Sequence, residues 1–249
     1  MKVHSRNISF GLKCLGLVFG VIAAGGSVRG DTIFTTPSSA STSGPVSAKA
    51  DFTLGNGTIT LTLTNLISDP GDVAQNLSAF SFTLNGTVGA NSLVSGTGTE
   101  RTINSNKTYT EGSSVAAGWV ESSTGNTLTL DVLSGTGHAG PAHTIIGSPA
   151  TADNKYDNAN GSIKNNGPHN PFLDGSATFT LDVAGVTTSS SIQSVTFQFG
   201  TTDGSNQITV NLPNSPLISA APLPASAWGG LTLIGLMGLR RRSIRRAAI

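Results

Sequence analysis

The sequence predicts an all-β domain, an antiparallel β-sandwich of jelly-roll or immunoglobulin-like type, over about residues 31–215. Glycine occupies 31 of the 249 positions, and serine, threonine and asparagine are abundant. This composition favours strands and tight turns, because these residues are poor helix formers. Several short runs also alternate apolar with hydroxyl-bearing residues, which is the period of a strand with one buried face. Two such faces can bury each other.

Six alternating runs carry this prediction. Asn56-Gly57 separates two alternating halves of residues 50–66, and an Asn-Gly pair in that position predicts a β-hairpin. Five further runs alternate in the same way. The apolar residues expected to face inward are Phe52, Leu54, Ile59, Leu61 and Leu63; Phe80, Phe82 and Leu84; Leu128, Leu130 and Val132; Phe179, Leu181 and Val183; Val195, Phe197 and Phe199; and Ile208, Val210 and Leu212.

Charge is segregated along the chain. The formal net charge is +1, but residues 31–220 hold five basic and all thirteen acidic residues, a net charge of −8. The other basic residues lie in the first thirty and the last ten positions. An acidic body argues against a nucleic-acid partner, because binding phosphates requires clustered lysine and arginine.

The first thirty residues predict a signal peptide. Lys2, Arg6 and Lys13 precede an apolar run at 14–24 and then small residues, which is the pattern of a secretory signal helix. We expect export through the secretory translocon and cleavage by signal peptidase after Gly30, with sites at 25 or 27 as alternatives. The one cysteine, Cys14, lies inside this segment, so the mature chain can form no disulfide.

The last segment, residues 216–249, predicts a membrane anchor. Prolines in Pro222-Leu223-Pro224 precede an uncharged stretch at 225–239, about 22 Å long as a helix. Its anchoring residues are Trp228, Leu231, Leu233, Ile234, Leu236 and Leu239. The basic cluster that follows is Arg240, Arg241, Arg242, Arg245 and Arg246. These arginines predict that the end of the helix stays cytoplasmic and the body lies outside. The complete prediction is therefore an all-β domain between a signal helix and a transmembrane helix.

This order of motif, short apolar helix and arginine cluster resembles the tripartite PEP-CTERM sorting signal of exported bacterial proteins. The motif itself, Ala221 to Pro224, is similar to the VPLPA variant of that signal. The resemblance implies processing by an exosortase-type membrane enzyme, with the protein anchored at the cell envelope and then placed at the cell surface or outside the cell. An ordinary membrane anchor is the alternative. The body also resembles uncharacterised exported bacterial proteins that carry GTGHAGPAH, NANGSI and NGPHNPF.

Residues 135–175 form a long segment of little periodicity, rich in glycine, proline, asparagine and histidine. Such a long loop is usually functional or mobile. His138, His143 and His169 lie here and could bind a divalent cation together with nearby aspartates. The alternative is that they hydrogen-bond the loop backbone or face solvent. DNKYDNANG at 153–161 is similar to a calcium loop, although the same residues also form ordinary turns.

No catalytic motif is recognisable. There is no GxSxG elbow, and the three glutamates, Glu100, Glu111 and Glu121, lie in polar sequence where we expect exposure. Trp119 is expected in the core, with sugar stacking by Trp119 and Tyr109 or Tyr156 as the alternative. We therefore expect a non-catalytic, exported protein of the cell surface or extracellular matrix, without a cofactor, with extracellular polysaccharide among its partners. The alternative is a secreted carbohydrate- or metal-binding module that holds calcium or another divalent cation.

Overall fold

The computed structural model describes residues 32–41 and 43–211, and it is all-β as predicted. The elements are β1 Thr32–Thr35, β2 Ser39–Ser41, β3 Gly44–Val46, β4 Ala48–Leu54, β5 Thr58–Asn65, the 3-10 helix η1 Val73–Gln75, β6 Leu77–Leu84, β7 Asn91–Ile103, β8 Tyr109–Ala116, β9 Val120–Thr124, β10 Thr127–Asp131, β11 Ile145–Ile146, β12 Phe172–Val183, β13 Ile192–Phe199 and β14 Gln207–Asn211. The predicted signal peptide, sorting motif, apolar anchor and arginine cluster lie outside these residues. Within them, no helix has the length and apolarity that crossing a membrane requires.

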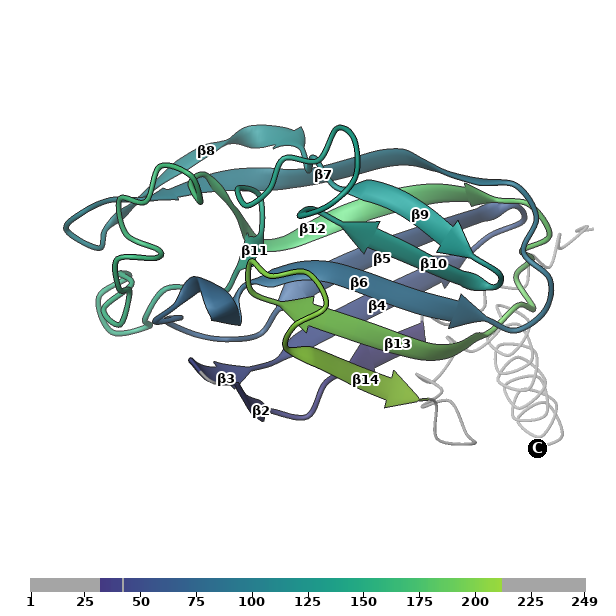
Figure 1. The fold of residues 1–249 in the computed structure, drawn as a ribbon, viewed down its shortest axis with the longest axis horizontal. Helices are drawn as coiled ribbons and strands as arrows, with labels where there is room; N and C mark the ends of the chain where they lie inside the picture. Colours follow the sequence, from purple (N-terminus) through teal and green to yellow (C-terminus); the bar gives the residue numbers. More distant parts are fainter. Residues whose placement is uncertain (1–31, 42, 212–249) are drawn as a thin grey trace, which may run out of the picture.

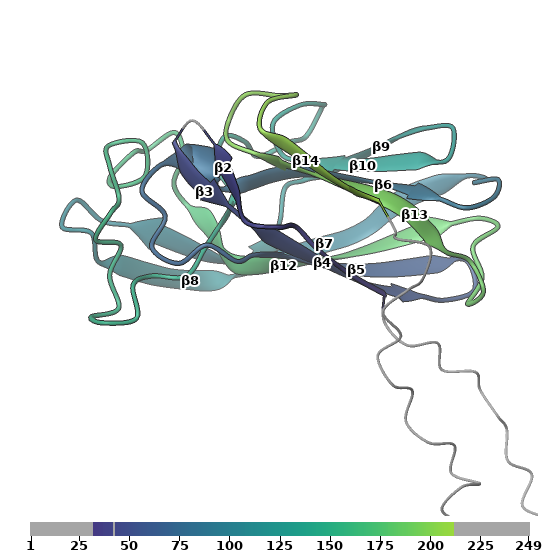
Figure 2. The same ribbon diagram turned by 90° about the horizontal axis from the view of Figure 1, so that it is seen from below.

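The strands form two layers packed face to face (Figure 1 and Figure 2). A six-stranded layer has the order β1-β4-β5-β12-β7-β8, and a five-stranded layer has the order β14-β13-β6-β10-β9. All neighbours within each layer are antiparallel. The two-residue strand β11 joins the layers, because Ile145 pairs with Leu173 of β12 and with Leu77 of β6.

The predicted hairpin is confirmed. Strands β4 and β5 are antiparallel, Leu54 is opposite Ile59, and Gly57 in the turn has a φ of +79° that glycine adopts without strain. The other five runs also form strands, β6, β10, β12, β13 and β14. Their predicted inward residues are buried except Ile208 and Val210 on the edge strand β14, which are partly buried. Leu212 lies outside the described residues.

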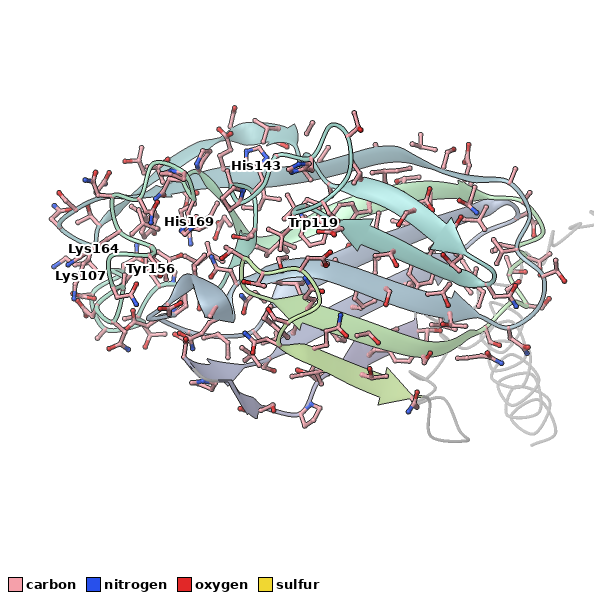
Figure 3. The ribbon with its side chains drawn as sticks, viewed as in Figure 1. Lys107, Trp119, His143, Tyr156, Lys164 and His169 are labelled. Carbon is pink, nitrogen blue, oxygen red and sulfur yellow. The ribbon has the colours of Figure 1, made fainter. Side chains whose placement is uncertain are left out.

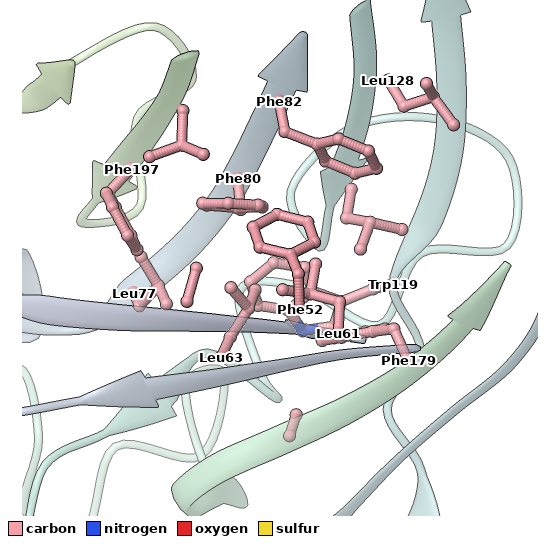
Figure 4. Close-up of a cluster of buried hydrophobic side chains, with 14 of the residues drawn as sticks. Phe52, Leu61, Leu63, Leu77, Phe80, Phe82, Trp119, Leu128, Phe179 and Phe197 are labelled. Atoms are coloured by element: carbon pink, nitrogen blue, oxygen red, sulfur yellow. The ribbon is translucent and has the colours of Figure 1, made fainter. Parts of the chain in front are cut away.

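Phenylalanines from both layers meet in the core (Figure 4). Phe52 of the six-stranded layer contacts Phe82 of the other layer in an edge-on arrangement, with ring centroids 5.1 Å apart. Phe80 packs against Phe197 at 4.9 Å. All four rings are at most 1% exposed. Burying side chains of this size is the largest source of stability in a domain without disulfides.

Strands β7, β8 and β9 are present although no hydrophobic alternation predicted them. In β7 two inward positions are glycines, Gly96 and Gly98. A Cβ at Gly96 would lie 2.9 Å from the ring of Phe179, and one at Gly98 would lie 3.2 Å from the Leu173 side chain. The bulky side chains of β12 fill the space over β7. The two positions of β7 at which apolar residues would have shown a strand pattern are therefore glycines.

The predicted irregular segment at 135–175 is only partly irregular. Ile145 and Ile146 form β11, and β12 begins at Phe172. Neighbouring residues here pack into two different hydrophobic clusters, since Ile145 lies in one cluster and Ile146 and Phe172 lie in the other. What remains without strands is 132–144 and 147–171. The second stretch, with the β7–β8 turn, closes one end of the domain, which we name the loop end (Figure 1).

The described chain starts and ends at the opposite end, which we name the tail end (Figure 2). Thr32 of β1 is opposite Phe52, close to the β4–β5 turn. Asn211 of β14 is opposite Ser194, close to the start of β13. Both ends of the domain therefore leave on the side away from the loop end.

Replacing Phe80 by alanine tests the inter-layer core. Removal of this ring leaves a cavity between the layers, so the free energy of unfolding should fall by about 3–5 kcal/mol. Urea denaturation followed by circular dichroism measures the change. Val94→Ala is the control, because Val94 is 57% exposed and its truncation should change stability by no more than about 0.5 kcal/mol. Equal losses in the two variants would contradict this account of the core.

Candidate functional site

The loop end is built around Tyr156, which is completely buried in a second hydrophobic cluster. The other members of this cluster are Val73, Ile103, Ile146, Ala159, Ile163 and Phe172. The phenol donates a hydrogen bond to the carbonyl oxygen of Gly147 at 2.8 Å. A Cβ on Gly147 would lie 1.8 Å from the carbonyl oxygen of Ile67, so only glycine fits there. Residues 147–171 are thus a packed structure with its own core.

Arg101 of β7 connects this cluster to the sheet. Its side chain is 7% exposed, Nη1 donates to the Tyr156 hydroxyl at 2.9 Å and lies 2.6 Å from Oδ1 of Asp174, and Nη2 pairs with Glu111. The guanidinium also lies over the ring of Tyr109, 4.2 Å from its centroid. A buried guanidinium needs such anionic and hydrogen-bonding partners, because an unpaired buried charge is strongly destabilising. The arrangement fixes β7, β8, β12 and the loop segment to one another.

Burial has the largest effect on the pKa values of Asp174 and Tyr156. It raises the pKa of the Asp174 carboxyl, an effect that the Arg101 guanidinium opposes and the nearby Glu111 carboxylate reinforces. Burial likewise raises the pKa of the Tyr156 phenol well above its ordinary value, although Arg101 favours its ionised form. The phenol therefore keeps its proton at physiological pH and serves as a hydrogen-bond donor.

His143 is engaged at both ring nitrogens. Nδ1 lies 3.1 Å from the carbonyl oxygen of Ala117, and Nε2 lies 3.1 Å from Oε1 of Glu100. These two contacts join the 132–144 stretch to β7 and to the chain between β8 and β9. The main-chain carbonyl of His143 also accepts a hydrogen bond from Nε1 of Trp119. In this position both ring nitrogens face oxygen atoms of the protein.

The three histidines are not brought together as a metal site. Nδ1 of His169 lies 2.7 Å from the carbonyl oxygen of Ser162, and His138 is exposed in the 132–144 stretch; Figure 3 labels His143 and His169. Within residues 32–41 and 43–211, no group of three or more histidine, cysteine, aspartate or glutamate side chains is placed to hold a metal ion. The interpretation in which these histidines contact the loop backbone describes His143 and His169 better.

The residues of the calcium-like stretch at 153–161 also bind to other groups of the protein. Lys155 pairs with Asp153 at 3.4 Å, and the carbonyl of Asp157 accepts a hydrogen bond from the Lys107 ammonium. The amide of Asn160 donates to Asp72, which caps η1. Lys107 and Lys164 lie at this end of the molecule (Figure 3). The surface there has mixed charge, and its acidic and amide groups hold the loops to one another.

Trp119 lies in the core, as expected. It is 4% exposed and packs against Phe179 with centroids 5.3 Å apart, so its face is not available for stacking on a sugar. Trp119 also lines a groove of 420 Å³ beside β7. The groove is lined by Leu93, Val94, Ser95, Gly96, Thr97, Ala116, Gly118 and Trp119. No lining side chain is ionisable, which suits neutral contacts rather than acid–base chemistry.

Glu121 departs from the expected exposure. It lies opposite the buried Leu130 across β9 and β10, and therefore on the inner side of the layer. Its Oε1 is buried and, among the described residues, has no hydrogen-bond partner. Burial raises the pKa of this carboxyl. The polar residues around Glu121 led us to expect exposure, because only the strand register shows which face of the sheet the residue lies on.

Comparisons with protein-family models, with curated proteins and with solved structures found no match for this chain.

Replacing Arg101 by methionine tests its role in holding the loop end. The change keeps much of the aliphatic stem but leaves Asp174, Glu111 and the Tyr156 hydroxyl without their shared partner. Stability should fall by about 3 kcal/mol, and limited proteolysis should cleave within 147–171 before the rest of the domain. Lys49→Met is the matched control, because Lys49 pairs with Asp51 on the surface and its loss should cost no more than about 1 kcal/mol. Unchanged protease resistance in the Arg101 variant would refute this role.

Glu121→Gln tests the partly buried carboxyl through the pH dependence of stability. Because the folded-state pKa is raised, the contribution of Glu121 is most favourable below its ordinary value of 4.5 and is lost as the pH rises through the raised value. The variant should therefore unfold at a higher temperature than the parent at pH 7, and the difference should shrink by pH 4. Thermal melts across this range measure it. Asp153→Asn, at an exposed position, should show no comparable trend, and a trend of opposite sign for Glu121→Gln would contradict the argument.

Proposed function

We propose that this chain is an exported, non-catalytic β-sandwich protein of the cell surface or extracellular matrix. The secretory translocon and signal peptidase would deliver it, and an exosortase-type membrane enzyme would sort and process it. The proposal begins with the two chain termini, whose residues carry the signal-peptide pattern and the resemblance to a PEP-CTERM signal.

The observation that best supports the proposal is the placement of both domain ends at the tail end. The proposed sorting segment continues from β14, so an anchor there would hold the domain by its tail end. The loop end, at the far side of the two layers (Figure 2), would then point away from the membrane. If the two ends of the domain lay on different sides, an anchor would not so clearly determine which end of the domain faces away from the membrane.

The polar groups of the loop end fit a structural rather than a catalytic role. Arg101 and Tyr156 have their polar atoms engaged with neighbouring strands and loops, and so does His143 in the 132–144 stretch. A general base or nucleophile instead needs a free group within reach of a substrate. The packed loop end supports the interpretation of a rigid surface displayed outside the cell.

Mass spectrometry of the mature protein from its native host tests the sorting step. The C-terminus should lie near Pro224, because processing would remove the apolar segment and the arginines. Pro222→Ala with Pro224→Ala should leave a larger share of the protein uncleaved and in the membrane fraction. Pro213→Ala with Pro216→Ala, two prolines outside the motif, is the matched control and should be processed as the parent is. An intact Ile249 in the mature protein would refute sorting and leave a simple anchor.

A further inference from the structure

We propose that the outer face of the five-stranded layer binds a neutral polysaccharide chain. This inference rests on the proposed function, since an exported protein meets the polysaccharides outside the cell, and it names the partner and the surface. The layer is the one nearer the viewer in Figure 1, formed by β14, β13, β6, β10 and β9. We name the surface made by the two rows described next the hydroxyl face.

The strand register aligns hydroxyl groups into two rows across all five strands. The first row is Thr209, Thr196, Ser81, Thr129 and Ser122. The second row is Asn211, Ser194, Thr83, Thr127 and Thr124. Strand geometry spaces neighbours within a row by about 4.8 Å and the two rows by about 7 Å. Nine of these ten residues carry a hydroxyl and the tenth carries an amide, so every position can both donate and accept a hydrogen bond.

Hydrogen bonds between strands orient part of this face. Thr83 and Thr127 share a hydrogen bond of 2.8 Å between their hydroxyls, and Thr196 and Thr209 share one of 2.9 Å. In each pair one hydroxyl donates to the other, and the second hydroxyl keeps a proton that it can donate to another partner. Groups held in place before binding lose less conformational entropy when a ligand arrives.

The absence of charge indicates the chemistry of the partner. None of the ten residues is ionisable, whereas about a quarter to a third of an ordinary soluble surface is charged. The edge strands β9 and β14 also carry no charge in these rows, although edges are commonly protected by charged residues. The body as a whole has a charge of −8 over residues 31–220, which repels anionic polymers. A neutral, hydroxyl-rich polymer satisfies both conditions.

The twist of the layer favours a flexible chain over a flat crystalline surface. Neighbouring strands in a sheet rotate by about 20–25°, and the layer is visibly twisted in Figure 2. The hydroxyl rows therefore turn across the five strands. A polysaccharide chain can follow this turn, whereas a planar lattice such as ice can contact only part of it.

Affinity gel electrophoresis of the full chain in a non-ionic detergent tests the proposal. The gels contain dextran, laminarin, galactomannan or xyloglucan as neutral probes, and alginate as an anionic one. We expect at least one neutral polymer to retard the protein and alginate to have no effect. The double variants Thr83→Val with Thr127→Val and Thr196→Val with Thr209→Val should each weaken the retarding interaction by about tenfold, since each removes two oriented hydroxyls.

The matched control is Thr62→Val with Thr178→Val, which removes a similar threonine pair, 3.1 Å apart, from the outer face of the other layer. It should leave binding within about twofold of the parent. Valine keeps the preference for strands, and thermal melts verify that each variant is folded. No retardation by any neutral probe, stronger retardation by alginate, equal losses in the control, or shaping of ice crystals without polysaccharide binding would each overturn the proposal. Because this assay does not depend on processing, its failure is distinguishable from a failure of the sorting proposal.

Discussion

Burial of the two inner faces against each other is the interaction on which the rest of this structure depends. Residues 32–211 contain no cysteine, so no disulfide supports the domain. The phenylalanines of β4, β6 and β13 are among the largest side chains that the core removes from water. This packing also explains a strand that looks poorly suited to a core. Strand β7 holds Gly96 and Gly98 at inward positions because Phe179 and Leu173 already occupy the space above them.

The loop end follows a different physical rule, in which polar groups rather than apolar area determine the arrangement. Arg101 is buried among groups that come from β8, β12 and the loop segment, and each of them limits where the others can lie. His143 does the same between β7 and the chain before β9. The sequence offered His143 as a candidate metal ligand, and in the structure its ring contacts Ala117 and Glu100.

Three surfaces consequently have different roles in the proposed function. The tail end is where the chain would be held, the loop end is a packed cap of mixed charge, and the hydroxyl face is a regular, uncharged array. Such a division suits a protein whose task is to be positioned and to make contacts. The groove beside Trp119 runs along β7, and the partly buried Glu121 lies on the inner side of β9.

The sequence alone determined the class of fold and its clearest hairpin, because these depend on local patterns: alternation along β4, β5, β6, β10, β12 and β13, and the turn preference of Asn56-Gly57. It could not show β7, since a glycine that accommodates Phe179 carries no hydrophobic signal. It could not place Glu121 inside or Arg101 beside Tyr156 and Asp174 either. Those facts depend on strand register and on residues far apart in the chain, which only the tertiary structure brings together. The alignment of hydroxyls into rows was decided in the same way, because the threonines are visible in the sequence but their register across five strands is not.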